Sequence, residues 1–185
     1  DQLLALIAGH WKLAGRLKGD GVVATVMSNL GLERYLNANG ILLKRTQVGD
    51  RYVVEEMRTD GFNLGGEQSG HLILGDYSTT GDGLISALQV LAILVRQTRP
   101  ASVICNVFKP VPQLIRNVHF DNTKILDSLD LEEVIESAES KLAGTGRILI
   151  RESGTEPLLR IMAEGNDPDL VREVVNNIET FIESS

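Results

Sequence analysis

A glycine-rich segment at residues 65–71 places three polar side chains at alternate positions: Glu67, Ser69 and His71. If the second half of this segment is extended, the three side chains point to one side of the backbone and converge on one ligand. A carboxylate accepts hydrogen bonds from hydroxyl or ammonium groups, a hydroxyl donates or accepts, and an imidazole donates to a phosphate oxygen or transfers a proton. This set suits a polar phosphosugar. A hairpin whose polar side chains only face water explains the spacing equally well.

A second segment, residues 151–157, carries groups that bind anions. Gly154 permits a positive φ that turns successive backbone N–H groups toward one point, and Ser153 and Thr155 add hydroxyl donors. Arg151 and the nearby Arg160 offer bidentate, charge-assisted bonds to phosphate oxygens. Together these residues predict a phosphate clamp.

The alternative for this second segment is an ordinary turn in which Arg151 forms a surface ion pair with Glu152 or Glu156. The segment is not a Walker A loop, because no Gly-Lys-Ser/Thr sequence opens a helix after it.

Other polar residues are expected to have structural roles. His10 lies on a helix that also carries Lys12 and Arg16, so we expect it at the surface, and His119 falls in a strand. Asp82 precedes a long apolar helix, so capping that helix is favoured over binding a metal.

Alternating patterns before residue 107 predict an α/β layer domain. Asp1 can cap a helix whose apolar residues recur every three or four positions; they are Leu4, Ile7, Ala8, Trp11 and Ala14. We expect strands at 22–26 and 41–48, helices at 30–36, 51–57 and 83–99, and a short strand pair at 62–64 and 71–74.

Three prolines, at 100, 110 and 112, mark a change of pattern, so we place the domains at 1–107 and 108–185. The second domain is expected to be a smaller α+β domain with an antiparallel sheet. Its strands are predicted at 113–120, 147–150 and 158–163. One helix carries Asp130 and Glu133 at capping-box spacing, and another begins at Asp167-Pro168.

Composition narrows the class of protein further. The net charge is −7 with no run of Lys or Arg, which argues against nucleic acid or anionic membrane as a partner. The single cysteine, Cys105, forms no internal disulfide and fits a buried site in a reducing, cytoplasmic environment. The longest apolar stretch, 84–95, is too short to span a bilayer. The start at Asp1, directly in a helical pattern, favours a piece of a longer protein.

At the two segments the chain resembles the α-D-phosphohexomutase superfamily, which carries a Gly-Glu-x-Ser-Gly sugar loop and an Arg-x-Ser-x-Thr-Glu-Pro phosphate loop. They stand here as residues 66–70 and 151–157. Gln68, together with Thr25-Val26-Met27-Ser28-Asn29-Leu30-Gly31 and Val48-Gly49-Asp50-Arg51-Tyr52-Val53, is similar to the phosphoglucosamine mutase branch. The resemblance covers the whole chain as the third and fourth of four domains.

The resemblance implies an amino-sugar enzyme of cell-wall precursor synthesis. It interconverts glucosamine 6-phosphate and glucosamine 1-phosphate through a phosphoserine and a bisphosphate intermediate. Glu67 and Ser69 would hold sugar hydroxyls, and His71 would contact phosphate or transfer a proton. The phosphate that is not transferred would lie on Arg151, Ser153, Gly154, Thr155 and Arg160. Arg51 is a secondary phosphate candidate.

The catalytic serine and the Asp-rich Mg²⁺ loop of the family are not in this chain, so the resemblance implies no metal site and no catalysis by these residues alone. The partners would be a hexosamine phosphate and the two preceding domains. Three alternatives stay open: a hexose-phosphate mutase of other sugar preference, a non-catalytic phosphosugar-binding module, and a structural domain pair whose loops bind nothing.

Overall fold

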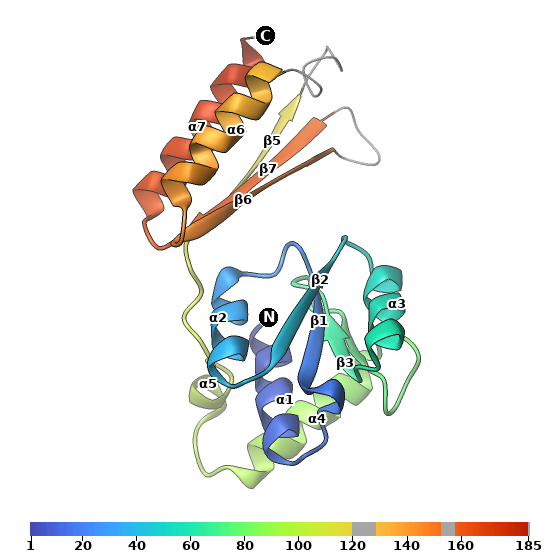
Figure 1. Ribbon diagram of the computed structural model, residues 1–185. Coiled ribbons are helices and arrows are strands. Elements are labelled where there is room, and N and C mark those ends of the chain that lie inside the picture. The colour runs from blue at the N-terminus through green and yellow to red at the C-terminus, as the bar shows by residue number, and fades with distance from the viewer. Residues whose placement is uncertain (120–128, 153–157, 185) are drawn as a thin grey trace. The chain divides into compact units, whose positions relative to one another are not determined.

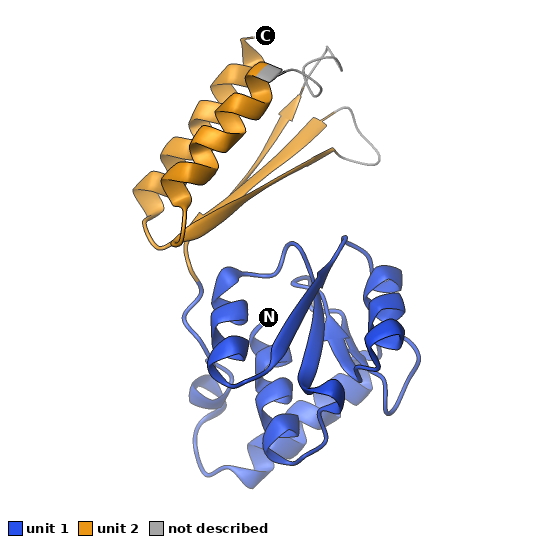
Figure 2. Cartoon of the chain, viewed as in Figure 1, with its two compact units in different colours: residues 1–110 blue, residues 111–185 orange. Residues whose placement is uncertain are grey.

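The chain divides into two units after Pro110 in the computed structural model, which describes residues 1–119, 129–152 and 158–184 (Figure 2). Residues 108–110, which the sequence assigned to the second domain, belong to the first unit. Gln2 holds this stretch, because its side-chain amide donates to the Phe108 carbonyl and accepts from the Val107 N–H, both at 2.8 Å.

The first unit contains a four-stranded sheet in the order β2-β1-β3-β4 (Figure 1). Its strands are β1 (Gly21–Thr25), β2 (Leu42–Thr46), β3 (Leu64–Gly66) and β4 (Leu72–Leu74). The first three are parallel, and β4 pairs antiparallel to β3. Every residue of β1 is buried, as expected for a central strand covered on both faces.

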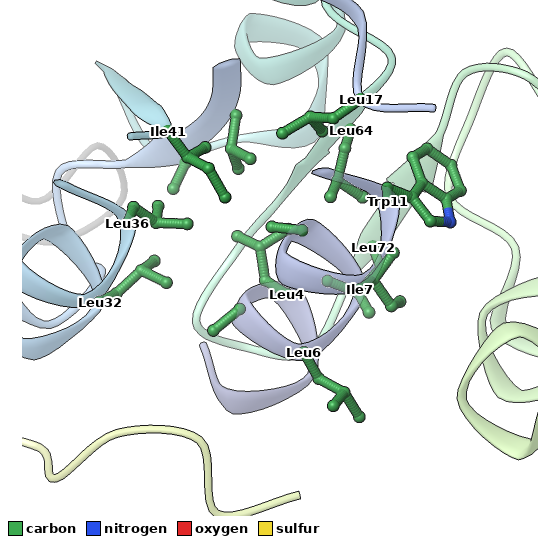
Figure 3. Packing of buried hydrophobic residues seen from close by; sticks show 14 of the residues in the cluster. Leu4, Leu6, Ile7, Trp11, Leu17, Leu32, Leu36, Ile41, Leu64 and Leu72 are labelled. Carbon is green, nitrogen blue, oxygen red and sulfur yellow. The ribbon is translucent and has the colours of Figure 1, made fainter. Parts of the chain in front are cut away.

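Helices cover both faces of this sheet. They are α1 (Gln2–Leu13), α2 (Leu30–Ala38), α3 (Asp50–Asp60) and α4 (Gly83–Arg96), with a short turn η1 (Lys18–Asp20) and a short helix α5 (Ala101–Ile104). The larger core joins α1, α2 and α4 to one face of the sheet, and a smaller core joins α3 to the other face. Figure 3 shows the α1 side chains among buried residues of α2, β3 and β4, namely Leu36, Leu64 and Leu72, and beside Ile41, which directly precedes β2. The α/β layer prediction is confirmed.

Three helices differ from their predicted bounds, and α2 does so only by ending at Ala38 instead of residue 36. The helix predicted at 83–99 ends at Arg96, because Gln97 is extended and Pro100 disfavours helical backbone just before it. The short α5 that follows was not predicted. Helix α3 runs from Asp50 to Asp60, longer than the predicted 51–57, and ends at Gly61 in the left-handed conformation.

The strand pair predicted at 62–64 and 71–74 exists, but β3 begins two residues later than expected. Phe62 lies outside the strand, and its ring packs over Gly19 and Gly21. Asp1 precedes α1 as predicted, but its side chain makes no capping hydrogen bond to that helix. The Asp1 carboxylate instead accepts from the Asn29 N–H at 2.9 Å. Ala14, expected on the buried face of α1, is exposed.

The second unit is an antiparallel sheet in the order β5-β7-β6 with two helices (Figure 1). Its elements are β5 (Gln113–His119), α6 (Leu129–Leu142), β6 (Gly146–Glu152), β7 (Leu158–Gly165) and α7 (Pro168–Glu183). Both helices pack on one face, where α7 buries Val171, Val174, Val175, Ile178 and Ile182. The predicted α+β domain with an antiparallel sheet is confirmed.

The two helix starts predicted in this unit have different outcomes. Asp167 caps α7 as expected, since its carboxylate accepts from the N–H groups of Asp169 and Leu170. Asp130 lies inside the first turn of α6, not ahead of it, so the capping-box prediction is wrong. A carboxylate in a first turn still favours the helix through its dipole.

Candidate functional site

The carboxyl ends of β1, β2 and β3 meet at one edge of the first sheet, because the three strands are parallel. The connections that leave this edge are residues 26–29, 47–49 and 67–71. In open α/β sheets ligands bind at this edge, where several connections can each contribute a side chain. The predicted sugar loop is therefore placed where the fold can build a site.

The loop itself is a tight turn, not an extended segment. The Gly70 N–H donates to the Glu67 carbonyl at 3.0 Å, and the Glu67 N–H donates to the His71 carbonyl at 2.9 Å. The antiparallel pairing of β3 with β4 runs to Gly66 opposite Leu72, so only five residues remain to reverse the chain. The prediction of an extended segment that places the Glu67, Ser69 and His71 side chains on one side of the backbone is therefore wrong.

Ser69 lies at the tip of this turn and is exposed, as are Gln68 and Gly70. In the described structure no hydrogen bond joins Ser69 to Glu67 or His71. Gly70 has φ +101°, a conformation that favours glycine at the turn.

Glu67 reaches across to the connection between β2 and α3. Its Oε1 accepts from the Gly49 N–H at 3.0 Å, and Gly49 has φ +132°, which an L side chain rarely adopts. The second carboxylate oxygen makes no hydrogen bond within residues 1–119. The bond therefore fixes the direction of the carboxylate and leaves it able to accept hydroxyl groups.

His71 lies beside the next residue of the same connection. Its Nε2 is 3.8 Å from the Asp50 Oδ2, at the first residue of α3. The Nε2 atom is buried and makes no hydrogen bond in the described structure. The ring packs on Gly81, where an added Cβ would lie 1.9 Å from Nε2. The lack of a side chain at Gly81 thus leaves the space that the imidazole occupies.

The Gly49-Asp50 pair is a feature that sequence reasoning missed. It contacts both Glu67 and His71, one through a backbone N–H and one through a carboxylate. A glycine followed by an acidic residue directly after a strand was a readable signal of a tight, helix-opening turn. Its link to the sugar loop depends on β2 and β3 flanking β1, which only the sheet order supplies.

Other residues near this edge have structural roles. Gly65 allows α3 to approach the sheet, since a Cβ there would lie 2.7 Å from atoms of both Val53 and Met57. The Arg45 guanidinium braces the β1–α2 connection by donating to the Ser28 carbonyl at 2.8 Å and to Glu33 at 2.9 Å.

Arg51, the secondary phosphate candidate, is on the surface of α3. Its guanidinium lies 4.4 Å from the centre of the Tyr52 ring and donates to the Tyr52 hydroxyl. This hydrogen bond raises the pKa of Arg51. The structure brings it into no contact with Glu67 or His71, and its role stays a prediction.

In the second unit, Arg151 and Arg160 are directly opposite each other on β6 and β7. Opposite residues of an antiparallel pair point to the same face, so two positive charges lie side by side. Burial and, to a lesser degree, Arg160 lower the pKa of Arg151. The Arg151 Nε is buried without a hydrogen-bond partner, and neither arginine forms an ion pair among the described residues.

At the other end of the same face of the sheet, an arginine does bind a carboxylate. Arg147 of β6 donates from Nε to the fully buried carboxylate of Glu164 at 2.6 Å, and Gln113 donates to the same carboxylate at 3.2 Å. That arginine is neutralised within the sheet. The pair beside the connection between β6 and β7 has no such carboxylate among the described residues, and two neighbouring guanidinium groups are suited to bind an anion.

The predicted ion pair of Arg151 with Glu152 is not formed. Adjacent residues of a strand face opposite sides, and Glu152 pairs across from Leu159 on the helix-covered side. Ser153, Gly154, Thr155 and Glu156 lie outside the described residues, so the loop part of the phosphate clamp stays a prediction.

Neither a metal site nor a further catalytic group was found in the described parts of the chain. No group of three or more His, Cys, Asp or Glu residues there could hold a metal ion, and no helix is long and apolar enough to cross a membrane. Asp82 caps α4 as expected, accepting from the N–H groups of Leu84 and Ile85.

The expectation that His10 is a surface residue is wrong. Its ring is half-buried and makes a 2.9 Å hydrogen bond with the Gln97 side chain. Burial, and then the charge of Arg96, lower the pKa of His10. It lines a pocket of about 460 Å³ near Asn39, which lies toward the amino ends of the strands, away from the sugar loop.

Two family models together cover most of the chain. The model described as "Phosphoglucomutase/phosphomannomutase, alpha/beta/alpha domain III" matches residues 1–111, and the model of the C-terminal domain matches residues 115–180. The chain belongs to the phosphoglucomutase/phosphomannomutase family. The two matched stretches correspond to the two units of the structure.

Among curated members of this phosphohexomutase family, the similarity is high. The chain is 58% identical over 183 residues to a phosphoglucosamine mutase of Parvibaculum lavamentivorans and 60% identical over 178 residues to that of Novosphingobium aromaticivorans. These alignments cover 99% and 96% of the chain but only 41% and 40% of the relatives. The chain thus spans about two-fifths of the length of these phosphohexomutases.

Solved structures agree on the fold. An N-acetylphosphoglucosamine mutase of Aspergillus fumigatus superimposes with a TM-score of 0.83 at 19% identity over 100% of this chain and 43% of its own. An N-acetylglucosamine-phosphate mutase in its substrate complex gives 0.79 at 20% identity, over 98% of this chain and 43% of its own. At these identities the comparison supports the phosphohexomutase fold alone.

Proposed function

We propose that this chain is the substrate-recognition part of a phosphoglucosamine mutase. The longer enzyme interconverts glucosamine 6-phosphate and glucosamine 1-phosphate through a phosphoserine and a bisphosphate intermediate. The observation that carries the proposal is the arginine pair of β6 and β7, which has no neutralising carboxylate among the described residues. The 58% identity of this chain to a curated phosphoglucosamine mutase supports the choice of glucosamine phosphate as the substrate.

The proposed roles follow the chemistry of each group. Glu67, held by Gly49, accepts hydrogen bonds from sugar hydroxyls or the amino group, and Ser69 adds a hydroxyl. His71 contacts phosphate or transfers a proton. Arg151 and Arg160, with Ser153, Gly154 and Thr155, hold the phosphate that is not transferred. A clamp that accepts either phosphate lets the bisphosphate intermediate reorient.

Mg²⁺ and the phosphoserine are proposed to come from the domains that precede this chain, and the site of action is the cytoplasm. One structural neighbour, an N-acetylphosphoglucosamine mutase, is in complex with GlcNAc-6P and magnesium. In the described residues of this chain no cluster suits a metal. The 185 residues by themselves are therefore expected to be inactive.

The test is a mutase assay on a reconstituted enzyme, in which the N-terminal part of the Parvibaculum lavamentivorans enzyme is fused ahead of this chain. Glucosamine, glucose and mannose phosphates are compared in the presence of Mg²⁺. Strong preference for glucosamine phosphate is expected. Preference for a neutral hexose would keep the family and overturn the sugar, whereas a folded fusion without turnover on any of them would favour a phosphosugar-binding module.

A further inference from the structure

Helix α4 carries no charged residue between Asp82 and Arg96. One side of it packs into the core of the first unit, with Ser86 and Ile93 buried and Ile85, Val90 and Leu94 against the same cluster. The opposite side is also apolar. A surface helix of a globular protein ordinarily has a polar outer face, and a helix that is apolar all round is ordinarily buried.

Four residues form this outer side, and we call them the α4 stripe: Leu84, Leu88, Leu91 and Val95. Their exposed fractions are 80%, 62%, 53% and 86%. They recur at intervals of four, three and four residues, so they lie in one line along the helix. The line is roughly 16 Å long at 1.5 Å per residue. An apolar surface of this kind, uninterrupted by charge, marks an interaction site.

We propose that the α4 stripe is covered by an apolar surface of the domains that precede this chain in the longer mutase. The inference rests on the proposed function, because it takes that longer enzyme as the protein concerned. The matched family models are domain III and the C-terminal domain, and the curated relatives carry about three-fifths of their length outside the match. A partner of sufficient size is therefore part of the same polypeptide.

The connection point supports this partner. Chain preceding Asp1 enters the first unit at the start of α1, and α1 packs directly against α4. Side chains of both helices, including Trp11 and Ile93, line a common pocket. A preceding domain is thus joined to the first unit through α1, a helix that contacts α4, and tethering raises its effective concentration at the surface of this unit without any large contact area.

A second copy of this chain fits the α4 stripe less well. A stable interface between separate proteins buries about 800 Å² on each partner. One line of four side chains on a single helix supplies only part of that area, and α4 ends in the charged residues Asp82 and Arg96. A tethered domain does not need the full area.

Cysteine protection tests the proposal. In a Cys105→Ser background, Leu88→Cys is labelled with a maleimide in the 185-residue chain and in the reconstituted enzyme. Arg172→Cys on α7 is the control, since the Arg172 side chain is 61% exposed and the Leu88 residue 62%. Burial in the fusion should slow labelling at position 88 by about tenfold or more, while position 172 keeps its rate.

Leu88→Glu gives a second readout. In the 185-residue chain its melting temperature should not fall, because the side chain faces solvent there. In the reconstituted enzyme it should fall, because the glutamate is forced into an apolar contact. Equal labelling rates at position 88 in both proteins would overturn the proposal. So would protection in the 185-residue chain that disappears on dilution, since the occupant is then a second copy.

Neither readout uses substrate. If an active fusion is labelled at position 88 as fast as the 185-residue chain, the result would count against the α4 contact alone. Intact protection in an inactive fusion would count against the proposed function alone.

Discussion

At the scale of single residues, the paired arginines of the second unit are the most informative feature. Two like charges facing each other across a strand pair destabilise a sheet unless a ligand neutralises them. The same face neutralises Arg147 with Glu164, so the sheet can supply a carboxylate where one is needed. Arg151 and Arg160 have no carboxylate partner among the described residues, which agrees with the proposed role of this pair in holding a phosphate.

Replacing either arginine is expected to weaken phosphosugar binding. Arg151→Ala or Arg160→Ala in the reconstituted enzyme should cost about 1–3 kcal/mol for each charge-assisted bond, or roughly 5- to 150-fold in affinity. Calorimetric titration with glucosamine 6-phosphate measures this. Arg172→Ala, at an exposed ion pair on α7, should leave affinity unchanged. Wild-type affinity in both arginine variants would favour loops that bind nothing.

Gly81 is expected to act through His71. Gly81→Ala would place a Cβ 1.9 Å from the imidazole Nε2, so the ring must leave its present position beside Asp50. The reconstituted enzyme should lose as much kcat/KM as it does on His71→Ala, and the double variant should lose no more than His71→Ala alone. Gly83→Ala is the matched control, because no atom lies within 4 Å of its added Cβ. Additive losses would show that Gly81 acts independently of the histidine.

At the scale of elements, the three strands of the second unit are joined by one buried carboxylate. Glu164 of β7 has no exposed surface, and it binds Arg147 of β6 and Gln113 of β5. A charge removed from water is tolerated because both neighbours donate to it. The sheet therefore depends on this residue as well as on its apolar helix-covered face.

Removing this carboxylate should destabilise the second unit. Glu164→Ala removes the buried carboxylate that the partly buried Arg147 binds, and we expect a loss of about 2–4 kcal/mol in the free energy of unfolding. Urea titration of the 185-residue chain, followed by circular dichroism, measures the loss. Glu152→Ala, at an exposed position of the same sheet, should change stability by less than about 0.5 kcal/mol. A loss below 1 kcal/mol for Glu164→Ala would contradict the argument.

At the scale of the whole molecule, two groups of the first unit link its stability to pH in the same direction. The pKa of His10 is lowered from 6.5, by burial first and by Arg96 second. Burial alone would raise the pKa of Asp76, but hydrogen bonds from Lys18 and Asn63 and the charges of Lys18 and Arg16 lower it from 3.8. In both cases the unfolded chain binds protons at a higher pH than the folded chain, so acid favours unfolding.

Thermal stability should therefore fall in two pH windows. Above pH 6.5 the contribution of His10 to folding stability is constant. This contribution is lost as the pH falls from 6.5 through the lower pKa of the folded state. The Asp76 contribution is present above 3.8 and is lost below it. His10→Gln should remove the first window and keep the second, as followed by melting temperature against pH. The exposed His119→Gln is the control, and an unchanged first window in His10→Gln would refute the assignment.

The sequence by itself determined the element types and most of their bounds, because periodicity and capping residues act over a few positions. Asp82 and Asp167 cap the helices that they precede, as predicted. It also determined the family, since the two loop motifs are local. Errors arose where a distant residue competes with a local one, as when the Asp1 carboxylate binds Asn29 and the Phe62 ring covers Gly21.

Only the tertiary structure decided how the candidate site is assembled. The sheet order brings Gly49 and Asp50 to Glu67 and His71, and hairpin pairing places Ser69 at the exposed tip of the turn. The strand register places Arg151 directly opposite Arg160, whereas the side chain of Glu152 lies on the other face of the sheet. These relations join residues 9 to 21 positions apart, so no local pattern encodes them, and they follow from which strands pair and in which register.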